Sequence, residues 1–122
     1  MKVLIVDDSK AMRMIVGRTL SQTDVGKCTV VEAVNGAEGL QKLQAEQPDI
    51  VLSDWNMPEM TGIQFLQKLR ESGSRVIFGF ITSETGQEIR DLAIDSGADF
   101  IIRKPFTAQT LNTELQPCLA KS

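Results

Sequence analysis

Short runs of apolar residues alternate along the 122-residue chain with longer segments whose apolar positions recur every three or four residues. The runs are rich in Val and Ile and nearly continuous, which is typical of parallel strands buried on both faces. The pattern predicts five strands, at Val3–Val6, Thr29–Val34, Ile50–Leu52, Val76–Ile81 and Phe100–Ile102.

Each run is followed by a segment with helical periodicity, so a strand and a helix are expected five times in succession. Ser9 and Thr107 are placed to cap the first and last helices, and Pro117 is expected to end or kink the last one early. Because right-handed crossovers place helices on both faces of a parallel sheet, we expect a doubly wound α/β fold. Without a linker-like tract, residues 1–122 are expected to form one domain.

The composition narrows the possible chemistry. The chain has no histidine, which excludes Ser-His-Asp and Cys-His nucleophiles, zinc sites that need imidazole, and a phosphohistidine of its own. A net charge of −3 argues against a binder of duplex DNA, which normally has a basic face. Cys28 and Cys118 are far apart and are expected to be structural thiols in a reducing cytosol. The longest apolar run, Val76–Ile81, is too short to cross a membrane, and a cytoplasmic location is expected.

Polar residues follow four of the predicted strands, at the ends where parallel sheets bind ligands. They are Asp7, Asp8, Asp54, Thr82, Ser83 and Lys104. Four of them have a simpler interpretation when taken alone. Asp8 would serve as a cap of the first helix, Thr82 and Ser83 as caps of the fourth, and Lys104 as a solvated charge.

Taken together, these residues would bring three carboxylates, a hydroxyl and an ammonium to one edge of the sheet. Like charges repel there by roughly 1–4 kcal/mol per pair, and a site that tolerates this usually holds a cation. Clustered carboxylate oxygens suit Mg²⁺, and the coordination shell of that ion commonly also includes an oxygen of a phosphoryl group. Since the chain lacks GxxxxGK[ST] and GxGxxG, nucleotide binding is not favoured. The residues therefore suggest phosphoryl chemistry on a carboxylate.

Four motifs, in this order and spacing, make the whole chain resemble the receiver domain of two-component response regulators. They are Asp7-Asp8, the segment DWNMPEMTG at 54–62, Thr82, and Lys104-Pro105-Phe106. The resemblance implies a flavodoxin-like (βα)5 fold with sheet order 2-1-3-4-5. Within the family, the segment at 54–62 and the absence of an output domain look most like the chemotaxis regulators.

The resemblance also implies a metal site and a phosphoryl acceptor. Asp54 would accept a phosphoryl group from the phosphohistidine of a partner histidine kinase. Asp8 and Asp54 would bind Mg²⁺ directly, Asp7 would bind it through a water, and Asn56 would contribute its backbone carbonyl. Positioning and neutralisation of charge are what phosphoryl transfer requires from a protein.

Further residues take switching roles by the same resemblance. Lys104 would pair with the phosphoryl oxygens across a cis peptide bond to Pro105, and Thr82 would turn its hydroxyl toward them. Asn56 and Glu84 stand at the positions that tune phosphoryl lifetime, and they imply a lifetime of seconds to minutes.

Two positions depart from the family pattern. Ser83 stands where Ala or Gly is usual and is expected to narrow the route to the acceptor. Ile101 replaces the aromatic residue of the switch, and Phe100 lies on the opposite pleat, where we expect it in the core.

Three other residues have assignments of their own. Trp55 is expected to cover part of the site mouth and to report ligand binding by its fluorescence. Arg13 and Arg18 are interpreted as solvated surface charges, with kinase docking as the alternative.

These roles describe a monomeric switch that changes its affinity for a partner and catalyses only its own phosphorylation and dephosphorylation. The expected partner is the flagellar motor switch, with an auxiliary phosphatase as another, and neither nucleic acid nor membrane insertion is expected. One alternative is a receiver in another phosphorelay, or a phosphate sink. A remote alternative is a small aspartyl-phosphate phosphatase of the haloacid-dehalogenase type. Those enzymes carry DxD with the acceptor on the first strand and have a cap, whereas this chain has Asp7-Asp8 there.

Overall fold

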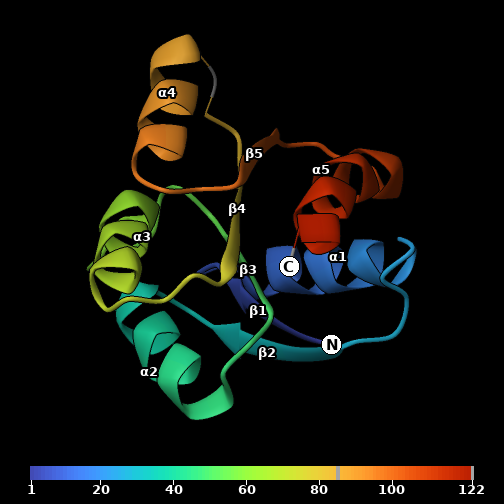
Figure 1. Cartoon of the computed structure of the whole chain (residues 1–122), viewed down its shortest axis with the longest axis horizontal. Helices are drawn as coiled ribbons and strands as arrows, with labels where there is room; N and C mark the ends of the chain where they lie inside the picture. The colour runs from blue at the N-terminus through green and yellow to red at the C-terminus, as the bar shows by residue number, and fades with distance from the viewer. Residues whose placement is uncertain (85, 122) are drawn as a thin grey trace.

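The computed structural model describes residues 1–84 and 86–121, which form a five-stranded parallel sheet with helices on both sides (Figure 1). The sheet order is β2-β1-β3-β4-β5, so the predicted doubly wound fold and its strand order are confirmed. The strands are β1 (Lys2–Val6), β2 (Thr29–Ala33), β3 (Ile50–Ser53), β4 (Ile77–Thr82) and β5 (Phe100–Arg103). The helices are α1 (Lys10–Ser21), α2 (Gly36–Glu46), α3 (Gly62–Glu71), α4 (Gln87–Asp95) and α5 (Ala108–Lys121).

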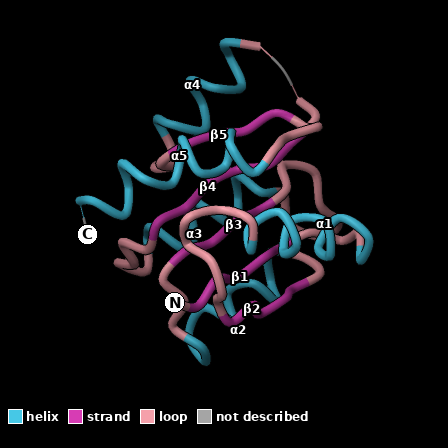
Figure 2. The backbone as a smooth tube through the Cα atoms, turned by 90° about the vertical axis from the view of Figure 1, so that its right-hand side faces the viewer, coloured by secondary structure: helices cyan, strands magenta, loops and turns pink. Residues whose placement is uncertain are grey.

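The sheet separates two hydrophobic clusters. Helices α1 and α5 lie against one face, and α2, α3 and α4 lie against the other (Figures 1 and 2). Successive residues of a strand point to opposite faces. In β1, for example, Leu4 and Val6 join the cluster under α2 and α3, whereas Val3 and Ile5 join the cluster under α1 and α5. Because its side chains alternate between the two faces, every central strand contributes residues to both hydrophobic clusters.

Strand β2 does not follow the prediction of burial on both faces. Val30 is 39% exposed, and Val34, which directly follows the strand, is 41% exposed. The reason is the position of β2 at the edge of the sheet, beside β1 alone. An apolar run does not distinguish an edge strand from a central one, so the sequence pattern overestimated its burial.

The helix starts agree with the predicted caps at two positions. Ser9 Oγ accepts from the backbone N–H of Met12 at 3.2 Å at the start of α1. Thr107 Oγ1 accepts from the N–H of Thr110 at 3.1 Å at the start of α5. Both bonds satisfy a backbone donor that the first helical turn leaves open.

Two interpretations of helix ends are wrong, namely Thr82 and Ser83 as caps of the fourth helix and an early end of the last helix at Pro117, whereas a kink at Pro117 stays a prediction. Helix α4 begins after Gly86 without a side-chain cap, so neither Thr82 nor Ser83 caps it. Pro117 neither ends nor shortens α5, which continues to Lys121. Because Pro117 is exposed and lies near the end of the helix, the one hydrogen bond that it removes does not interrupt the helix. Within the described residues, we find no helix with the length and apolar character needed to span a membrane.

Both cysteines are partly buried thiols that pack against the cluster under α1 and α5. Burial raises the pKa of the Cys28 thiol above its ordinary value. A raised pKa keeps the thiol protonated at neutral pH, where it behaves as a small apolar side chain. The packing of both side chains agrees with the interpretation as structural thiols, which stays a prediction.

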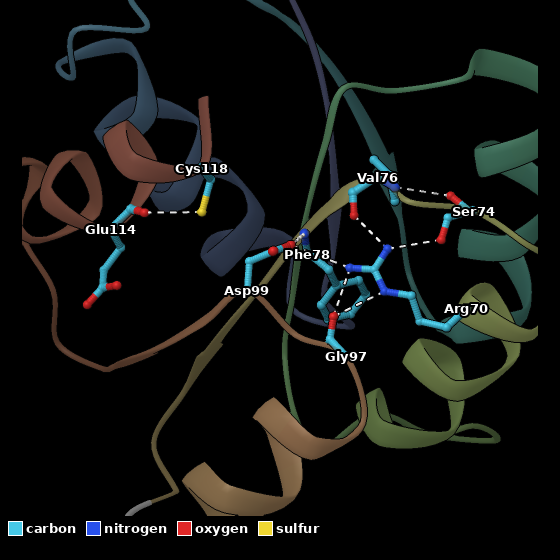
Figure 3. Close-up of polar contacts among 8 residues, drawn as sticks. All are labelled: Arg70, Ser74, Val76, Phe78, Gly97, Asp99, Glu114 and Cys118. Carbon is cyan, nitrogen blue, oxygen red and sulfur yellow. Dashed lines mark hydrogen bonds and ion pairs between the residues drawn. The ribbon is translucent and has the colours of Figure 1, made fainter. Parts of the chain in front are cut away.

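Arg70, at the end of α3, ties together the loops at the amino ends of β4 and β5 (Figure 3). Its Nε and Nη2 donate to the carbonyl of Gly97 at 3.1 and 2.8 Å. Its Nη1 donates to the carbonyls of Ser74 and Val76 at 3.1 and 2.7 Å. Burial lowers the pKa of the guanidinium, and the neighbouring Asp99 opposes that shift. This contact fixes the edge of the sheet opposite the polar residues described next.

Candidate functional site

Three carboxylates meet at the carboxyl edge of the sheet, as the strand order predicts. Asp7 and Asp8 directly follow β1, and Asp54 directly follows the neighbouring strand β3. One carboxylate oxygen from each residue lies within 4.8 Å of the other two. Asp7 is buried, Asp54 is partly buried and Asp8 is exposed, so the cluster opens to solvent on the side of Asp8. Three hard oxygen donors this close together could hold a divalent metal ion.

Lys104 brings a positive charge into this cluster from the end of β5. Its Nζ lies 3.5 Å from Asp54 Oδ1 and 3.6 Å from Asp7 Oδ2. The backbone N–H of Lys104 donates to the carbonyl of Thr82 at 2.8 Å, and its peptide bond to Pro105 is cis, as the resemblance implied. The ammonium group therefore faces two of the three carboxylates from across the sheet edge.

The surroundings of Asp7 disfavour its charged form. Burial is the main cause that raises the pKa of Asp7 above its ordinary value, and the carboxylates of Asp54 and Asp8 raise it further. The N–H of Ser9, which donates to Asp7 Oδ1 at 2.9 Å, and the ammonium of Lys104 act in the opposite direction. The net effect disfavours the charged form of Asp7 and would be reversed by a cation.

Asp54 is held by the segment that follows it. The N–H of Trp55 donates to Asp54 Oδ1 at 2.7 Å, and the N–H of Asp54 donates to the carbonyl of Val6 at 2.9 Å. The N–H of Gly62 donates to the carbonyl of Trp55 at 2.8 Å, which brings the start of α3 against the backbone of Asp54. A Cβ at Gly62 would overlap the Asp54 carbonyl, so only glycine fits there. The sequence showed Gly62 as part of a motif but did not show this steric role.

The loop after β4 lies beside the cluster. Thr82 is buried, and its Oγ1 accepts from the N–H of Glu84 at 3.0 Å. Asn56 Nδ2 donates to Glu84 Oε1 at 2.9 Å, so the two residues assigned to lifetime tuning bond to each other across two loops. Ser83 is exposed, and its effect on the route to Asp54 stays a prediction.

The residues near the expected switch position lie on opposite faces of β5. Phe100 is 2% exposed in the cluster under α1 and α5, which confirms its assignment to the core. Ile101 packs at the border of the other cluster and lines a hollow of about 290 Å³ together with residues of α4.

The ring of Trp55 packs against Phe80 at a centroid distance of 4.9 Å. Trp55 is thus fixed beside Asp54 by a core ring.

Arg13 is not a solvated charge, and that interpretation is wrong. Its side chain is only 11% exposed. Nη1 donates to the backbone carbonyl of Asp7 at 2.7 Å, and Nε pairs with Glu32 Oε1 at 2.8 Å. Side chains of a helix point back toward its N-terminus, so a long residue in the first turn of α1 reaches the preceding loop. Its place five residues after Asp8 was the signal that could have revealed this, whereas Arg18 is exposed as expected.

Comparison with known proteins agrees with this geometry. Residues 3–116 match a family described as "Response regulator receiver domain". The chain is 38% identical to the chemotaxis protein CheY1 of Helicobacter pylori over 98% of its own length and 97% of that protein. It is 37% identical to the CheY homologue of Campylobacter jejuni, over 98% and 92% of the two chains.

Solved structures show the same arrangement of strands and helices. Vibrio cholerae CheY4 is 37% identical and superimposes with a TM-score of 0.83 over 95% of this chain and 96% of that one. The receiver domain of the putative response regulator NarL from Mycobacterium tuberculosis is 26% identical. It superimposes with a TM-score of 0.87 over 99% of this chain and 97% of that one.

Proposed function

Because the chain belongs to the response regulator receiver family, we propose that it is a signalling switch that accepts a phosphoryl group on Asp54. The observation that carries this proposal is the surroundings of the Asp54 carboxylate. It shares the edge of the sheet with two other carboxylates within 4.8 Å and with an ammonium at 3.5 Å. Such a cluster suits a reaction that brings a phosphoryl group and its charge to one carboxylate.

The transfer is a displacement at phosphorus. A carboxylate oxygen of Asp54 forms a bond to the phosphorus atom of a phosphohistidine on the partner kinase. The phosphorus–nitrogen bond breaks, and the electron pair leaves with the imidazole, which takes up a proton. The N–H of Trp55 and the ammonium of Lys104 both contact Asp54 Oδ1 and so restrain the attacking carboxylate at that oxygen.

The donor set fits Mg²⁺. Asp8 and Asp54 would bind the ion directly, Asp7 would bind it through a water, and the carbonyl of Asn56 would complete the protein ligands. When bound, the ion neutralises charge on the phosphoryl oxygens. The burial that raises the pKa of Asp7 supports this assignment, since a nearby cation would compensate its buried charge.

Lys104 and Thr82 are proposed to bind the transferred group. Lys104 Nζ already faces Asp54 and would pair with a phosphoryl oxygen there. Thr82 Oγ1 accepts from the N–H of Glu84, so its hydroxyl proton is available to donate to another phosphoryl oxygen. Ser83 would border the route to Asp54. The contacts of Lys104 and Thr82 with the phosphoryl group would change the conformation of the loop between β4 and α4.

Hydrolysis returns the switch to its resting state. A water oxygen bonds to phosphorus, the bond to the Asp54 oxygen breaks, the carboxylate leaves as the anion, and the protons of the water leave with the inorganic phosphate. Asn56 and Glu84, which bond to each other beside the site, are proposed to set a lifetime of seconds to minutes. Acting only on its own phosphoryl group, the chain is a switch and not an enzyme for a separate substrate.

The proposed output is a change in affinity for a flagellar motor switch protein, because the curated relatives are chemotaxis proteins. The face formed by α4, β5 and α5 would carry this change, with Ile101 in place of a switch aromatic.

We propose a cytoplasmic monomer that receives its phosphoryl group from a histidine kinase, with an auxiliary phosphatase as a further partner. Beryllofluoride-treated protein should bind a motor switch peptide more tightly than untreated protein. No gain in affinity would favour a phosphate sink or another phosphorelay.

The acceptor role is tested by adding a small acyl phosphate and Mg²⁺ while following the fluorescence of Trp55, the single tryptophan of the chain. Phosphorylation should change the emission within minutes and reverse when the donor is removed. Asp54→Asn should retain the fold by circular dichroism and lose the fluorescence response to the acyl phosphate. A normal response in Asp54→Asn would reject Asp54 as the acceptor.

A further inference from the structure

We propose that Arg13 is a positioning residue for the metal-binding turn, holding the peptide bond between Asp7 and Asp8 in the orientation that cation binding needs. The proposal rests on the proposed function, since it concerns the Mg²⁺ site of that switch. It assigns a role to a residue whose side chain bonds to the Asp7 carbonyl and to Glu32.

The contacts of Arg13 connect three elements. Arg13 belongs to the first turn of α1, its Nη1 reaches back to the Asp7 carbonyl at 2.7 Å, and its Nε reaches Glu32 on β2 at 2.8 Å. The Arg13 side chain is 11% exposed, whereas the Glu32 side chain is 50% exposed. The guanidinium is therefore covered by protein, and its acidic partner lies at the surface of the edge strand.

The bond to the Asp7 carbonyl fixes more than one atom. A peptide unit is planar, so the orientation of the Asp7 carbonyl also sets the N–H and Cα of Asp8. On the other side, the N–H of Asp7 donates to the carbonyl of Ala33 at 3.1 Å. The Asp7 side chain is fixed as well, since Oδ1 accepts from Ser9 and Oδ2 faces Lys104. Asp8 is exposed, and this peptide unit fixes the position of the Cα from which the Asp8 carboxylate side chain extends.

Arginine suits this role for a geometric reason. Its guanidinium presents several N–H groups in a rigid plane and can bond a carbonyl and a carboxylate in two directions at once. Lysine carries the same charge on a flexible stem without that fork. Arg13→Lys therefore keeps the electrostatic field at the site nearly constant while it removes the double contact. Residues that orient metal ligands typically change metal affinity by about tenfold or more when they are replaced.

The test is the dissociation constant for Mg²⁺, measured by calorimetry and by Trp55 fluorescence in otherwise identical buffers. Arg13→Lys is expected to weaken Mg²⁺ binding by about tenfold. The matched control is Arg70→Lys, which removes a guanidinium that bonds backbone carbonyls at the opposite edge of the sheet (Figure 3). Arg70→Lys should lower the free energy of unfolding and leave the dissociation constant unchanged. Unchanged Mg²⁺ affinity in Arg13→Lys, or an equal loss in both variants, would overturn the proposal.

A second pair of variants applies even where Arg13→Lys fails to fold. Glu32→Gln and Glu32→Ala remove the same charge from an exposed side chain, but only Gln keeps an oxygen that accepts from Arg13 Nε. Glu32→Ala should therefore bind Mg²⁺ about threefold more weakly than Glu32→Gln, the factor expected for one lost hydrogen bond. Equal dissociation constants in the pair would contradict the positioning role. Absence of Mg²⁺ binding in the unaltered protein would instead reject the metal site of the proposed function.

Discussion

Replacing Asp7 with Asn should stabilise the metal-free protein, although Asp7 is only 4% exposed. The change removes one of three clustered negative charges and preserves the shape of the side chain. Asn keeps an oxygen that accepts from the N–H of Ser9, so the bond to Asp7 Oδ1 has a counterpart in the variant. Lys104 keeps its contact with Asp54, so its ammonium stays paired.

The magnitude follows from the charges around Asp7. At the 4.8 Å limit that separates the carboxylate oxygens, Asp54 repels Asp7 by roughly 3–4 kcal/mol at an effective dielectric constant of about 20. Asp8 is exposed, and solvent reduces its repulsion to about 1 kcal/mol. Lys104, at 3.6 Å, returns an attraction of about 4–5 kcal/mol. The two repulsions and the attraction nearly cancel, so the cost of burying the charged carboxylate decides whether the variant is more or less stable. Because Asp7→Asn removes that cost, we expect its free energy of unfolding to rise by about 1–2 kcal/mol.

The assay is urea unfolding in the presence of a chelator, at neutral pH and again in acid. Burial raises the pKa of Asp7, so the folded chain holds its proton more tightly than the unfolded chain, whose carboxyl titrates near 3.8. The contribution of Asp7 to the stability of the unaltered protein therefore falls as the pH rises from 3.8 through the raised pKa, and then stays constant. Asp7→Asn lacks this loss, so its advantage should be largest at neutral pH and should disappear toward pH 3.8.

A matched control separates this effect from a general response to neutralised acids. Asp91 is an exposed residue of α4 whose Oδ1 accepts from Gln87, and Asp91→Asn should stay within about 0.5 kcal/mol of the unaltered protein. With saturating Mg²⁺ the advantage of Asp7→Asn should shrink, because the cation stabilises the unaltered protein more. A loss of stability in Asp7→Asn without metal would refute the reasoning and assign Asp7 a structural role.

Three further predictions concern the core, the ammonium and the phosphoryl lifetime. Gly79→Ala should lower the free energy of unfolding by about 3 kcal/mol in urea titrations, because its Cβ would overlap the buried ring of Phe100; a change below about 0.5 kcal/mol would show that the ring can move aside. Lys104→Met should raise Mg²⁺ affinity by about tenfold in calorimetry, because it removes a positive charge from two ligand carboxylates, and unchanged affinity would place the ion elsewhere. The phosphorylated protein should lose its phosphoryl group within seconds to minutes in Mg²⁺, whereas a half-life of many hours would contradict the roles given to Asn56 and Glu84.

The alternation of strands and helices was predictable from periodic, local features, and the meeting of the site residues was predictable from where each residue follows a strand. Apolar runs and helical stripes alternate regularly, and parallel strands bring their carboxyl ends to one edge. Asp7, Asp54 and Lys104 each directly follow a strand, so their convergence needs only the strand order. The family resemblance supplied that order, which hydrophobic periodicity alone does not determine.

The errors at Arg13 and Val30 arise from neighbours that are distant in the sequence. Arg13 looks like any charged residue of an amphipathic helix until β2 brings Glu32 to its guanidinium. Val30 looks like a core residue until its strand is known to lie at the sheet edge. The continuation of α5 through Pro117 depends on how much one lost hydrogen bond matters near a helix end, which local propensity does not report.

The most direct test of the central claim is to identify the residue that carries the phosphoryl group. The protein is incubated with a small acyl phosphate as donor and with Mg²⁺. The phosphorylated aspartate is then reduced with borohydride, and the peptides of the digested protein are sequenced by mass spectrometry. We predict modification at Asp54 alone, abolished by a chelator and absent in Asp54→Asn. Modification at another residue, or equal labelling without a divalent cation, would contradict the proposed mechanism.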